Sequence, residues 1–455
     1  MSWAIHLLAG LLGTGSWVAI NGVWVELPLL VASAPEGWLL PSYLTVITQL
    51  ANVGPLAVTL CHRFLPGRLS EVGVIYAILC LGSLACLLLA FFWRETSTLG
   101  VGGSGSRPPH STALLGLLFF LALVDCTSSV TFLPYMRRLR PPFLTSYFVG
   151  EGMSGLLPAL VALGQGVGAV RCLNSSLAGN ATGQQLRAEY QAGRFSAQAF
   201  FLFLGGMMLL SLAAFLLLNH LPAASRERAK EEKSQQLQPR RPPESQGGRP
   251  ATAGEEEEEG GEQRKRSRRA PPPRFGSGTY SWPQVAYLFG LLAWANALTN
   301  GVLPAVQPYS CLPYGNSAYH LAATLAALAN PLACFLGMFL PNRSLVPMGA
   351  LAGAGSLLAC YIMSMAVLSP CPPLLHRPAG AILMVLCWVL FVGTFSYVKL
   401  MIGLILRDEG HSALVWCGAV VQLGSMAGAL TMFPLVSVYS LFLAGDPCNP
   451  SCPAA

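Results

Sequence analysis

The sequence predicts an all-α polytopic membrane protein with eleven transmembrane helices in two related halves. Of its 455 residues, 53% are hydrophobic and only 10% are charged, and the mean hydropathy is +0.54. This balance excludes an ordinary soluble globular chain. Eleven apolar runs are long enough to cross a bilayer. Motifs from the first half of the chain also recur, in the same order, in the second half.

The predicted spans follow the apolar runs, each close to or above the roughly 20 residues that a transmembrane helix needs. They lie at about 5–33, 41–62, 72–93, 112–135, 143–168, 196–219, 283–307, 317–340, 345–368, 378–406 and 412–443. The N-terminus shows no signal-peptide cleavage pattern, so we expect the first run to remain as a span.

The first span is unusual because its centre carries polar and helix-disturbing residues. Trp17, Asn21, Trp24 and Pro28 follow the spacing i, i+4, i+7, i+11 and therefore share one helix face. Glu26 lies roughly opposite, unless Pro28 rotates it. Polar groups inside a membrane are costly and are kept where they face a cavity or a partner helix. We interpret the shared face as one wall of a solute pocket.

Internal repeats relate the two halves of the chain. Three pairs of motifs recur in order: NGVWVELP (21–28) as NGVLP (300–304), ANVGPLA (51–57) as ANPLA (329–333), and Glu151-x-x-Ser154 as Gln422-x-x-Ser425. Their offsets are 279, 278 and 271 residues. This order predicts a six-helix unit followed by a copy that lacks its last helix. Six spans per unit make the repeats parallel, as in major-facilitator-like and equilibrative-nucleoside-transporter-like carriers.

A polar segment, residues 221–281, separates a six-helix half (1–220) from a five-helix half (282–443), and a tail follows (444–455). Its charged and proline-rich composition predicts a disordered cytoplasmic linker. The net charge of +7 is compatible with nucleic-acid binding. The basic cluster at 264–269 lies between two membrane bundles, however, so attraction to anionic lipid is the better interpretation and we expect no nucleic-acid partner.

The distribution of positive charge predicts which side each loop faces. With a cytoplasmic N-terminus and an extracellular C-terminus, twenty of the 27 Lys and Arg residues lie inside and six lie outside. The linker supplies thirteen of the twenty, so the short loops alone favour this orientation only weakly. Two glycosylation acceptors, Asn174 and Asn180, lie in the 169–195 loop, which this orientation places outside.

The cysteines outside the spans support the same orientation. All five lie in predicted exterior segments: Cys172, Cys311, Cys371, Cys448 and Cys452. Disulfides persist on that oxidising side. We expect a disulfide between Cys371 and Cys448, because the tail can fold back over the loop between the ninth and tenth spans. Cys452 is the alternative partner of Cys371.

Several charged and polar residues lie within the predicted spans. The charged ones are Glu26, Asp125, Glu151 and Lys399. We weigh a structural salt bridge between Lys399 and Asp125 or Glu151 equally with a role in substrate handling. The fourth span adds a stripe of hydroxyls that includes Ser128, and the tenth adds Tyr397 beside Lys399. Such hydroxyls are also ordinary residues at helix–helix contacts.

The seventh span repeats the polar face of the first. Asn296, Asn300 and Gln307 follow the same helical spacing. For Asn21 and Asn300, contact with a ligand and hydrogen bonding to another helix, worth about 1 kcal/mol, remain alternatives. No Cys/His set has the spacing of a metal site and no Gly-rich loop follows a strand, so we expect neither an enzyme nor a metal or cofactor site.

Long motifs, spread over nearly the whole chain outside the linker and the 169–195 loop, carry a family resemblance. They are GSW (15–17), NGVWVELP (21–28), PEGW (35–38), LPSY (40–43), VTFLP (130–134), NALTNGVLP (296–304), SCLPYG (310–315) and LSPCP (368–372). On these motifs the chain resembles the animal riboflavin transporters. Details such as LVDCTSS (123–129) are similar to the epithelial-type branch of that family.

The resemblance implies sodium-independent, carrier-mediated uptake of riboflavin at the plasma membrane, favoured by mild acid, by a monomer that alternates its access. The polar residues of the spans suit that substrate, which is neutral, flat and aromatic, with a uracil-like edge and a polyol tail. We expect indoles to hold the ring, amides to bind its edge, and carboxylates or hydroxyls to bind the tail. The candidates are Trp17, Asn21, Trp24, Asp125, Ser128, Glu151, Asn296, Asn300, Gln307 and Tyr397. The rival functions are a nucleoside carrier and a multi-pass receptor.

Overall fold

The computed structural model describes most of the chain between Ser2 and Cys452. The described residues are 2–65, 68–97, 110–136, 138–139, 141–167, 170–175, 185–190, 193–222, 224–227, 280–340, 344–375, 377–409, 411–445, 448 and 452. The predicted linker, 221–281, therefore lies outside the described residues except at its two ends. The same holds for the predicted glycosylation acceptor Asn180.

Within its described residues, the first half contains eight α-helices and a β-hairpin. They are α1 (Ser2–Thr14), α2 (Val18–Ser33), the 3-10 turn η1 (Gly37–Leu39), α3 (Leu40–Leu50), α4 (Val53–Phe64), α5 (Glu71–Phe92), α6 (Thr112–Met136), α7 (Pro141–Gln165), β1 (Val170–Ser175), β2 (Gln185–Tyr190) and α8 (Ala197–His220). The hairpin is antiparallel and is an addition that the all-α prediction did not include.

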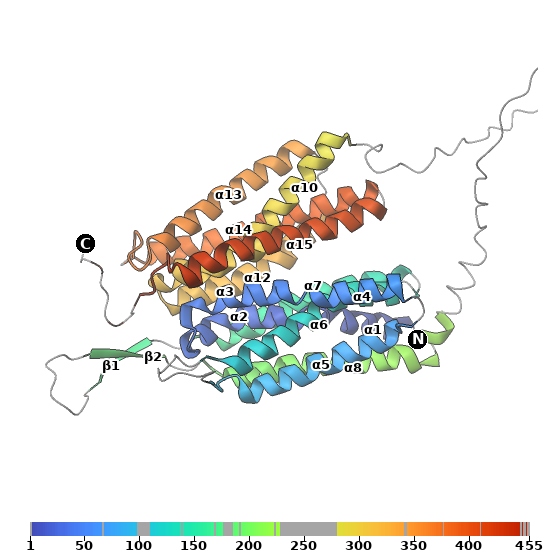
Figure 1. Ribbon diagram of the computed structural model, residues 1–455, viewed down its shortest axis with the longest axis horizontal. Helices are drawn as coiled ribbons and strands as arrows, with labels where there is room; N and C mark the ends of the chain where they lie inside the picture. The colour runs from blue at the N-terminus through green and yellow to red at the C-terminus, as the bar shows by residue number, and fades with distance from the viewer. Residues whose placement is uncertain are drawn as a thin grey trace, which may run out of the picture.

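The second half is helical throughout its described residues. Its elements are α10 (Trp282–Ala297), the π-helical turn η2 (Leu298–Val302), α11 (Leu303–Cys311), the 3-10 turn η3 (Leu312–Tyr314), α12 (Asn316–Phe339), α13 (Leu345–Val367), α14 (Pro378–Glu409), α15 (His411–Phe433) and the π-helical turn η4 (Pro434–Val438). Figure 1 shows these helices lying along those of the first half.

The predicted spans are confirmed. Within the described residues, ten helical segments are long and apolar enough to cross a membrane, and α1 with α2 passes the same test as a pair bent by 50°. Counting that pair gives eleven. The first predicted span, 5–33, is this bent pair. The second predicted span, 41–62, is α3 and α4, which are separated by a turn at Ala51 and Asn52.

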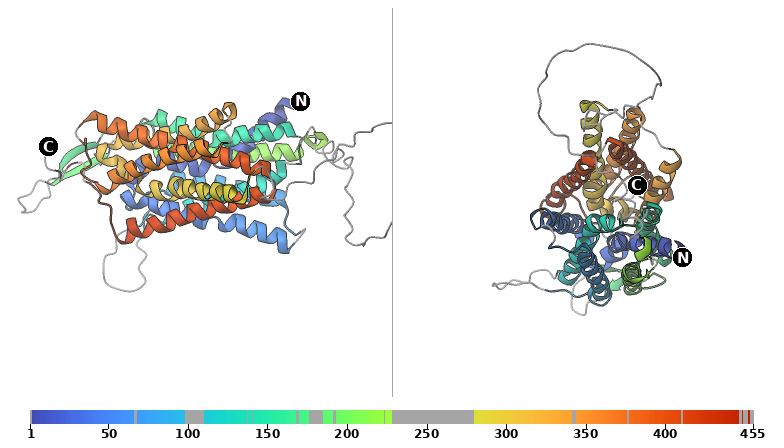
Figure 2. Two further views of the ribbon diagram at one scale, coloured as in Figure 1. Left: turned by 90° about the horizontal axis from the view of Figure 1, so that it is seen from above. Right: turned by 90° about the vertical axis from the view of Figure 1, so that its right-hand side faces the viewer.

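The contacts between helices have the symmetry that the repeats predict. The halves meet where α7 packs on α12 and where α3 packs on α15. In the internal repeat, α7 corresponds to α15 and α12 corresponds to α3. The contact of α7 with α12 is therefore equivalent to the contact of α15 with α3. The contacts of α12 with α2 and of α3 with α11 form another such pair. Seen end on, the helices of the two halves form two adjoining groups (Figure 2).

One end of the bundle carries the hairpin and both disulfides, and we call it the disulfide end. Cys172 of β1 is bonded to Cys448 of the tail, and Cys371 is bonded to Cys452. The first residues of α1 lie at the opposite end of the bundle (Figure 1).

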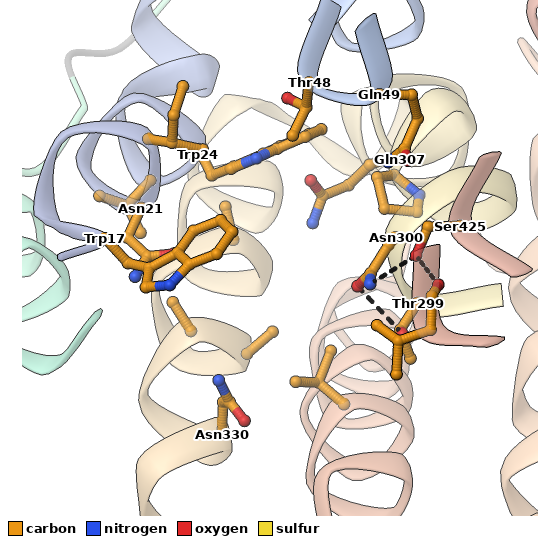
Figure 3. Close-up of a pocket in the computed structure, with 18 of the residues that line it drawn as sticks. Trp17, Asn21, Trp24, Thr48, Gln49, Thr299, Asn300, Gln307, Asn330 and Ser425 are labelled. Carbon is orange, nitrogen blue, oxygen red and sulfur yellow. Dashed lines mark hydrogen bonds between the residues drawn. The ribbon is translucent and has the colours of Figure 1, made fainter. Parts of the chain in front are cut away.

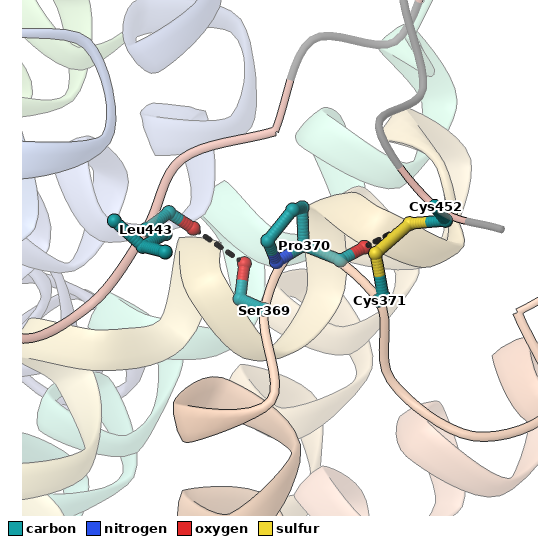
Figure 4. The surroundings of a disulfide bond; sticks show 5 residues. All are labelled: Ser369, Pro370, Cys371, Leu443 and Cys452. Atoms are coloured by element: carbon teal, nitrogen blue, oxygen red, sulfur yellow. Dashed lines mark hydrogen bonds between the residues drawn. A yellow bond between two sulfur atoms is a disulfide. The ribbon is translucent and has the colours of Figure 1, made fainter.

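The predicted pairing of Cys371 with Cys448 is therefore wrong, and the alternative partner, Cys452, is the correct one. The tail does fold back over the loop between α13 and α14, as expected, and the Ser369 hydroxyl donates to the Leu443 carbonyl over 2.7 Å (Figure 4). Cys448 instead reaches the hairpin, because β1 brings Cys172 to the same end. Cys311, predicted to lie outside, is a buried free thiol at the end of α11.

Candidate functional site

A cavity of about 430 Å³ lies between the two halves. This volume is within the range of roughly 300–1,000 Å³ that is typical of small-molecule sites. The lining residues are Trp17, Ile20, Asn21, Trp24, Val25, Thr48, Gln49, Asn52, Cys126, Thr299, Asn300, Pro304, Gln307, Ala323, Ala326, Ala327, Asn330, Trp388, Val392, Val421, Gln422 and Ser425. They include seven carboxamides and three indoles, and no Asp, Glu, Lys, Arg or His.

The bend between α1 and α2 builds the first wall of the cavity. Trp17 lies at the bend, and Asn21 and Trp24 follow on the first two turns of α2, so their side chains share the face that the spacing predicted (Figure 3). Glu26 faces away from the cavity. Its side chain is fully buried and accepts a hydrogen bond from the Gln165 amide over 3.1 Å.

The bend is stabilised by side chains from α6. A helix start leaves backbone N–H groups without partners inside the helix, and Asp125 accepts one of them, the Ile20 N–H, over 2.9 Å. The Ser128 hydroxyl donates to the Ser16 carbonyl over 2.9 Å. Asp125 and Ser128 therefore hold the broken first span in place from behind, and neither lines the cavity.

The π-helical turn η2 builds the opposite wall, with Thr299 and Asn300 on the turn and Gln307 on α11 (Figure 3). Gly301 lets α15 approach this turn closely, because a Cβ at that position would lie 2.5 Å from the Ala429 backbone nitrogen. Asn300 consequently reaches α15, where its amide donates to the Ser425 hydroxyl over 3.0 Å.

The two asparagines of the repeat occupy equivalent positions. Asn300 donates to Ser425, and Asn21 donates to Ser154 on α7 over 3.4 Å. The helix pairs involved, η2 with α15 and α2 with α7, are related by the repeat. Each asparagine thus makes an interhelical hydrogen bond and lines the cavity at the same time.

Five of the ten residues predicted to bind substrate line the cavity, namely Trp17, Asn21, Trp24, Asn300 and Gln307. Besides Asp125 and Ser128, three others lie outside the lining. Asn296 is buried behind Asn300 and accepts a hydrogen bond from its amide over 3.2 Å. The Tyr397 hydroxyl donates to the Leu340 carbonyl over 2.6 Å. Glu151 lies on α7, one turn before Ser154.

Lys399 does not pair with Asp125 or Glu151, the two carboxylates considered from the sequence. Its ammonium donates to the Thr299 hydroxyl over 3.1 Å, directly behind the lining of the cavity. The described residues place neither Asp125 nor Glu151 in an ion pair with it, since the described ion pairs are His110 with Glu36 and Arg138 with Glu71. Among the described residues, no group of three or more His, Cys, Asp or Glu side chains could hold a metal ion.

Several lining residues were not predicted from the sequence. Trp388 comes from α14, and its indole N–H donates to the Ser310 hydroxyl over 3.2 Å. Thr48 and Gln49 come from the last turn of α3. Asn52 and Asn330 belong to the second repeated motif, so the repeat itself contained the signal that could have identified them.

Comparisons with known proteins identify the family. The family model described as solute carrier family 52, riboflavin transporter, matches residues 1–444. The chain is 57% identical to riboflavin transporter member 3-B of Danio rerio, over all of both chains. It is 58% identical to riboflavin transporter 2 of Salmo salar, covering 99% of this chain and all of the relative. Identity to the human member 3 is 48% over all of both chains.

Solved structures with the same fold are distant in sequence. The D-xylose–proton symporter superposes with a TM-score of 0.53 at 13% identity, covering 94% of this chain and 88% of its own. The nucleoside transporter NupG superposes with a TM-score of 0.50 at 12% identity, covering 96% and 91%. At these identities the likeness shows the fold alone.

Proposed function

Because the chain belongs to solute carrier family 52, the riboflavin transporters, we propose that it carries riboflavin across the plasma membrane by exposing its central cavity alternately to the two sides. The observation that carries this proposal is the composition of the cavity. Its walls combine indoles with carboxamides and contain no charged side chain. Such a site suits a neutral, flat heterocycle with several hydrogen-bonding atoms.

In the proposed complex the isoalloxazine ring lies against Trp17 or Trp24, whose flat faces supply contact area. The uracil-like edge both donates and accepts hydrogen bonds, and a carboxamide such as Asn21 or Gln307 can do both in return. Asn300, whose two N–H groups bind Asn296 and Ser425, can only accept. Hydroxyls of the polyol tail then find partners among the remaining amides and threonines of the lining. Asp125 is left out of this assignment, because it lies behind the wall.

Contacts between the halves at the disulfide end support alternating access. Ser42 of α3 and Ser437 of η4 are hydrogen-bonded over 3.0 Å. Trp38 of η1 packs edge-on against Tyr309 of α11, with ring centroids 5.4 Å apart. These contacts close the disulfide end between the two halves. Separating them is the movement that would open the cavity on that side.

We assign the disulfide end to the outside of the cell, with the N-terminus in the cytoplasm. Disulfides persist on the oxidising side of a membrane, and both lie at this end. The glycosylation acceptor Asn174 lies in β1, two residues from Cys172. Removal of glycans by a glycosidase should shift the mobility of the wild-type protein, and the shift should be smaller for Asn174→Gln.

Uptake of labelled riboflavin by purified protein in liposomes tests the proposed function. We expect saturable uptake that excess unlabelled flavin competes away, that uridine or adenosine does not, and that persists when sodium is replaced by choline. Competition by nucleosides would favour the rival carrier function, for which the neutral, amide-rich cavity is also suited. Binding without any uptake would favour a receptor.

A further inference from the structure

Lys399 is an isolated positive charge beside the cavity. Its ammonium donates to the Thr299 hydroxyl over 3.1 Å, and Thr299 lines the cavity. The other helical elements that contribute lining residues, α2, α3, α6, η2, α11, α12 and α15, contain no Lys or Arg. The helices packed on α14, namely α10–α13 and α15, contain no Asp or Glu, and the described residues show no ion pair of Lys399. A cation without a counter-charge inside a membrane is costly and is typical of a functional position.

The internal repeat shows that this charge is specific to the second half. The contact of Lys399 with Thr299 corresponds to that of Asp125 with Ile20, because Ile20 and Thr299 are 279 residues apart, the offset of the NGV motifs. Asp125 and Lys399 are 274 residues apart, which lies within the range of offsets in the repeat. Each therefore stands behind the break of its span. The first wall has a carboxyl group there and the second an ammonium, so the second wall is the one that attracts the electron-rich atoms of a ligand.

The hydrogen bonds of Asn300 leave it able only to accept from a ligand. Its two N–H groups bind Asn296 over 3.2 Å and Ser425 over 3.0 Å. Its carbonyl oxygen lies 3.2 Å from the Thr299 hydroxyl, which connects it to Lys399. An amide whose N–H groups are both bonded is polarised, and this strengthens its oxygen as an acceptor.

Gln307 provides hydrogen-bond donors on the same wall. Figure 3 shows its side chain on the same side of the cavity as Asn300, which precedes it by seven residues. Within the described part of the chain, the Gln307 amide has no hydrogen-bond partner. The second wall therefore offers a ligand an acceptor from Asn300, donors from Gln307 and a positive charge behind both.

An imide edge has the matching pattern. The oxidised flavin ring has a single N–H group, which lies between two carbonyl groups. The N–H suits the Asn300 oxygen, and a carbonyl suits the Gln307 amide. The partial negative charges of the two carbonyls are stabilised by the Lys399 ammonium. The hydroxyls of the polyol tail are also satisfied by uncharged amides, so they gain less from the second wall.

We propose that the second wall binds the imide edge of the flavin and that Lys399 determines this orientation. Asn300 accepts the ring N–H. Lys399 acts through Thr299 and is therefore a positioning residue. The polyol tail is left to the uncharged amides of the first half, such as Asn21 and Gln49. The inference rests on the proposed transport of riboflavin and assigns which wall of the cavity recognises the ring.

Binding of riboflavin and of 3-methylriboflavin, in which a methyl group replaces the hydrogen of the ring N–H, tests the assignment of Asn300. Quenching of tryptophan fluorescence in the detergent-solubilised full chain gives the dissociation constants. The wild type should bind the methyl derivative about 5- to 150-fold more weakly, because a buried hydrogen bond is lost. In Asn300→Ala the ratio of the two constants should fall to about one, since the partner is already absent. In Asn21→Ala the ratio should keep its wild-type value.

Lys399→Met and Lys399→Arg separate the charge of Lys399 from its packing. Methionine removes the charge, so riboflavin should bind about five- to tenfold more weakly, since a charge roughly doubles the strength of a hydrogen bond. The absorption band of the bound flavin should also shift, because charges near the ring tune its electronic structure. Lys399→Arg should restore both properties. A lower thermal midpoint of Lys399→Met with unchanged affinity and spectrum would mean a structural role and would overturn the role of Lys399.

Thr299→Val supplies an additional variant, should Asn300→Ala fail to reach the membrane. It removes the hydroxyl between Lys399 and Asn300, so it should reproduce the weaker binding and the shifted spectrum of Lys399→Met. Loss of the discrimination in Asn21→Ala instead of Asn300→Ala would place the imide edge on the first wall and overturn the inference. Equal binding of the two flavins by the wild type would overturn it as well. Absence of riboflavin binding and uptake in the wild type would instead overturn the proposed function itself.

Discussion

The Asn300 amide donates to the Ser425 hydroxyl over 3.0 Å, while the same side chain lines the central cavity. Asn21 stands in the same relation to Ser154 in the first half. Ligand contact and interhelical bonding, which the sequence left as alternatives for these two asparagines, are thus compatible in one structure. Ser154 holds the Asn21 amide and leaves its second N–H and its carbonyl oxygen available to a ligand. Asn300 instead uses both N–H groups, on Ser425 and Asn296, so only its carbonyl oxygen, which also accepts from Thr299, is left for a ligand.

Replacing Asn21 with alanine should weaken riboflavin uptake without removing the protein from the membrane. A polar partner on the buried ligand would lose its hydrogen bond, which costs about 1–3 kcal/mol, or roughly a 5- to 150-fold rise in the half-saturation concentration. Uptake against concentration, normalised to surface protein, measures this. An unchanged half-saturation value would remove Asn21 from the binding site.

Ser154→Ala is the matched control for Asn21. It deletes the interhelical partner over the 3.4 Å contact and leaves the amide in the cavity. Loss of one such hydrogen bond in a membrane protein costs about 0.6–2 kcal/mol of stability. We expect a lower thermal midpoint in detergent and a change in half-saturation of less than about fivefold. A larger effect on affinity than that of Asn21→Ala would contradict the assigned roles.

Trp24 should contribute through the flat face of its indole. Truncation to alanine removes the stacking surface, which is worth about 1–3 kcal/mol in comparable ring-on-ring contacts. Trp24→Phe keeps an aromatic face and should recover most of the affinity. Quenching of tryptophan fluorescence by riboflavin, titrated with detergent-solubilised protein, gives the dissociation constants. Equal weakening by both substitutions would indicate a role other than stacking.

Gly301 and Gly22 are equivalent in the repeat but differ in what surrounds them. The atoms nearest to a Cβ at Gly301 would be backbone atoms of Gly428 and Ala429 on α15, whereas those nearest to a Cβ at Gly22 would belong to the Leu204 side chain. A side chain can rotate away and a helix backbone cannot, so overpacking at Gly301 should cost about 1–3 kcal/mol. We expect Gly301→Ala to lower surface expression strongly and Gly22→Ala to lower it little. Equal losses would contradict the close approach of α15.

The disulfide pairing can be tested by double substitution. Loss of either bond should destabilise the protein by about 2–4 kcal/mol. Cys172→Ser combined with Cys448→Ser should lower the thermal midpoint no more than either substitution alone, because each removes the same bond. Cys371→Ser combined with Cys448→Ser removes two bonds, so their effects on the thermal midpoint should add. Non-additive behaviour of this second pair would support a bond between Cys371 and Cys448 instead.

The sequence alone determined the spans, the repeat and the first wall of the cavity. Apolar run length is a local property, and the spacing of Trp17, Asn21 and Trp24 fixes a shared helix face wherever that helix lies. The recurrence of NGV at residue 300 likewise indicated a second wall from the seventh span. These features depend on neighbours in the chain, so no knowledge of packing was needed.

The tertiary structure decided which polar residues face the cavity and which cysteines meet. Asp125 lies behind the wall because the bend of the first span exposes the Ile20 N–H, which Asp125 accepts. Gln49, Asn52 and Trp388 line the cavity only because the two halves dock face to face. Cys448 bonds to Cys172 because a hairpin from the other half reaches the same end. Each of these outcomes depends on contacts between residues far apart in the chain, which local periodicity does not encode.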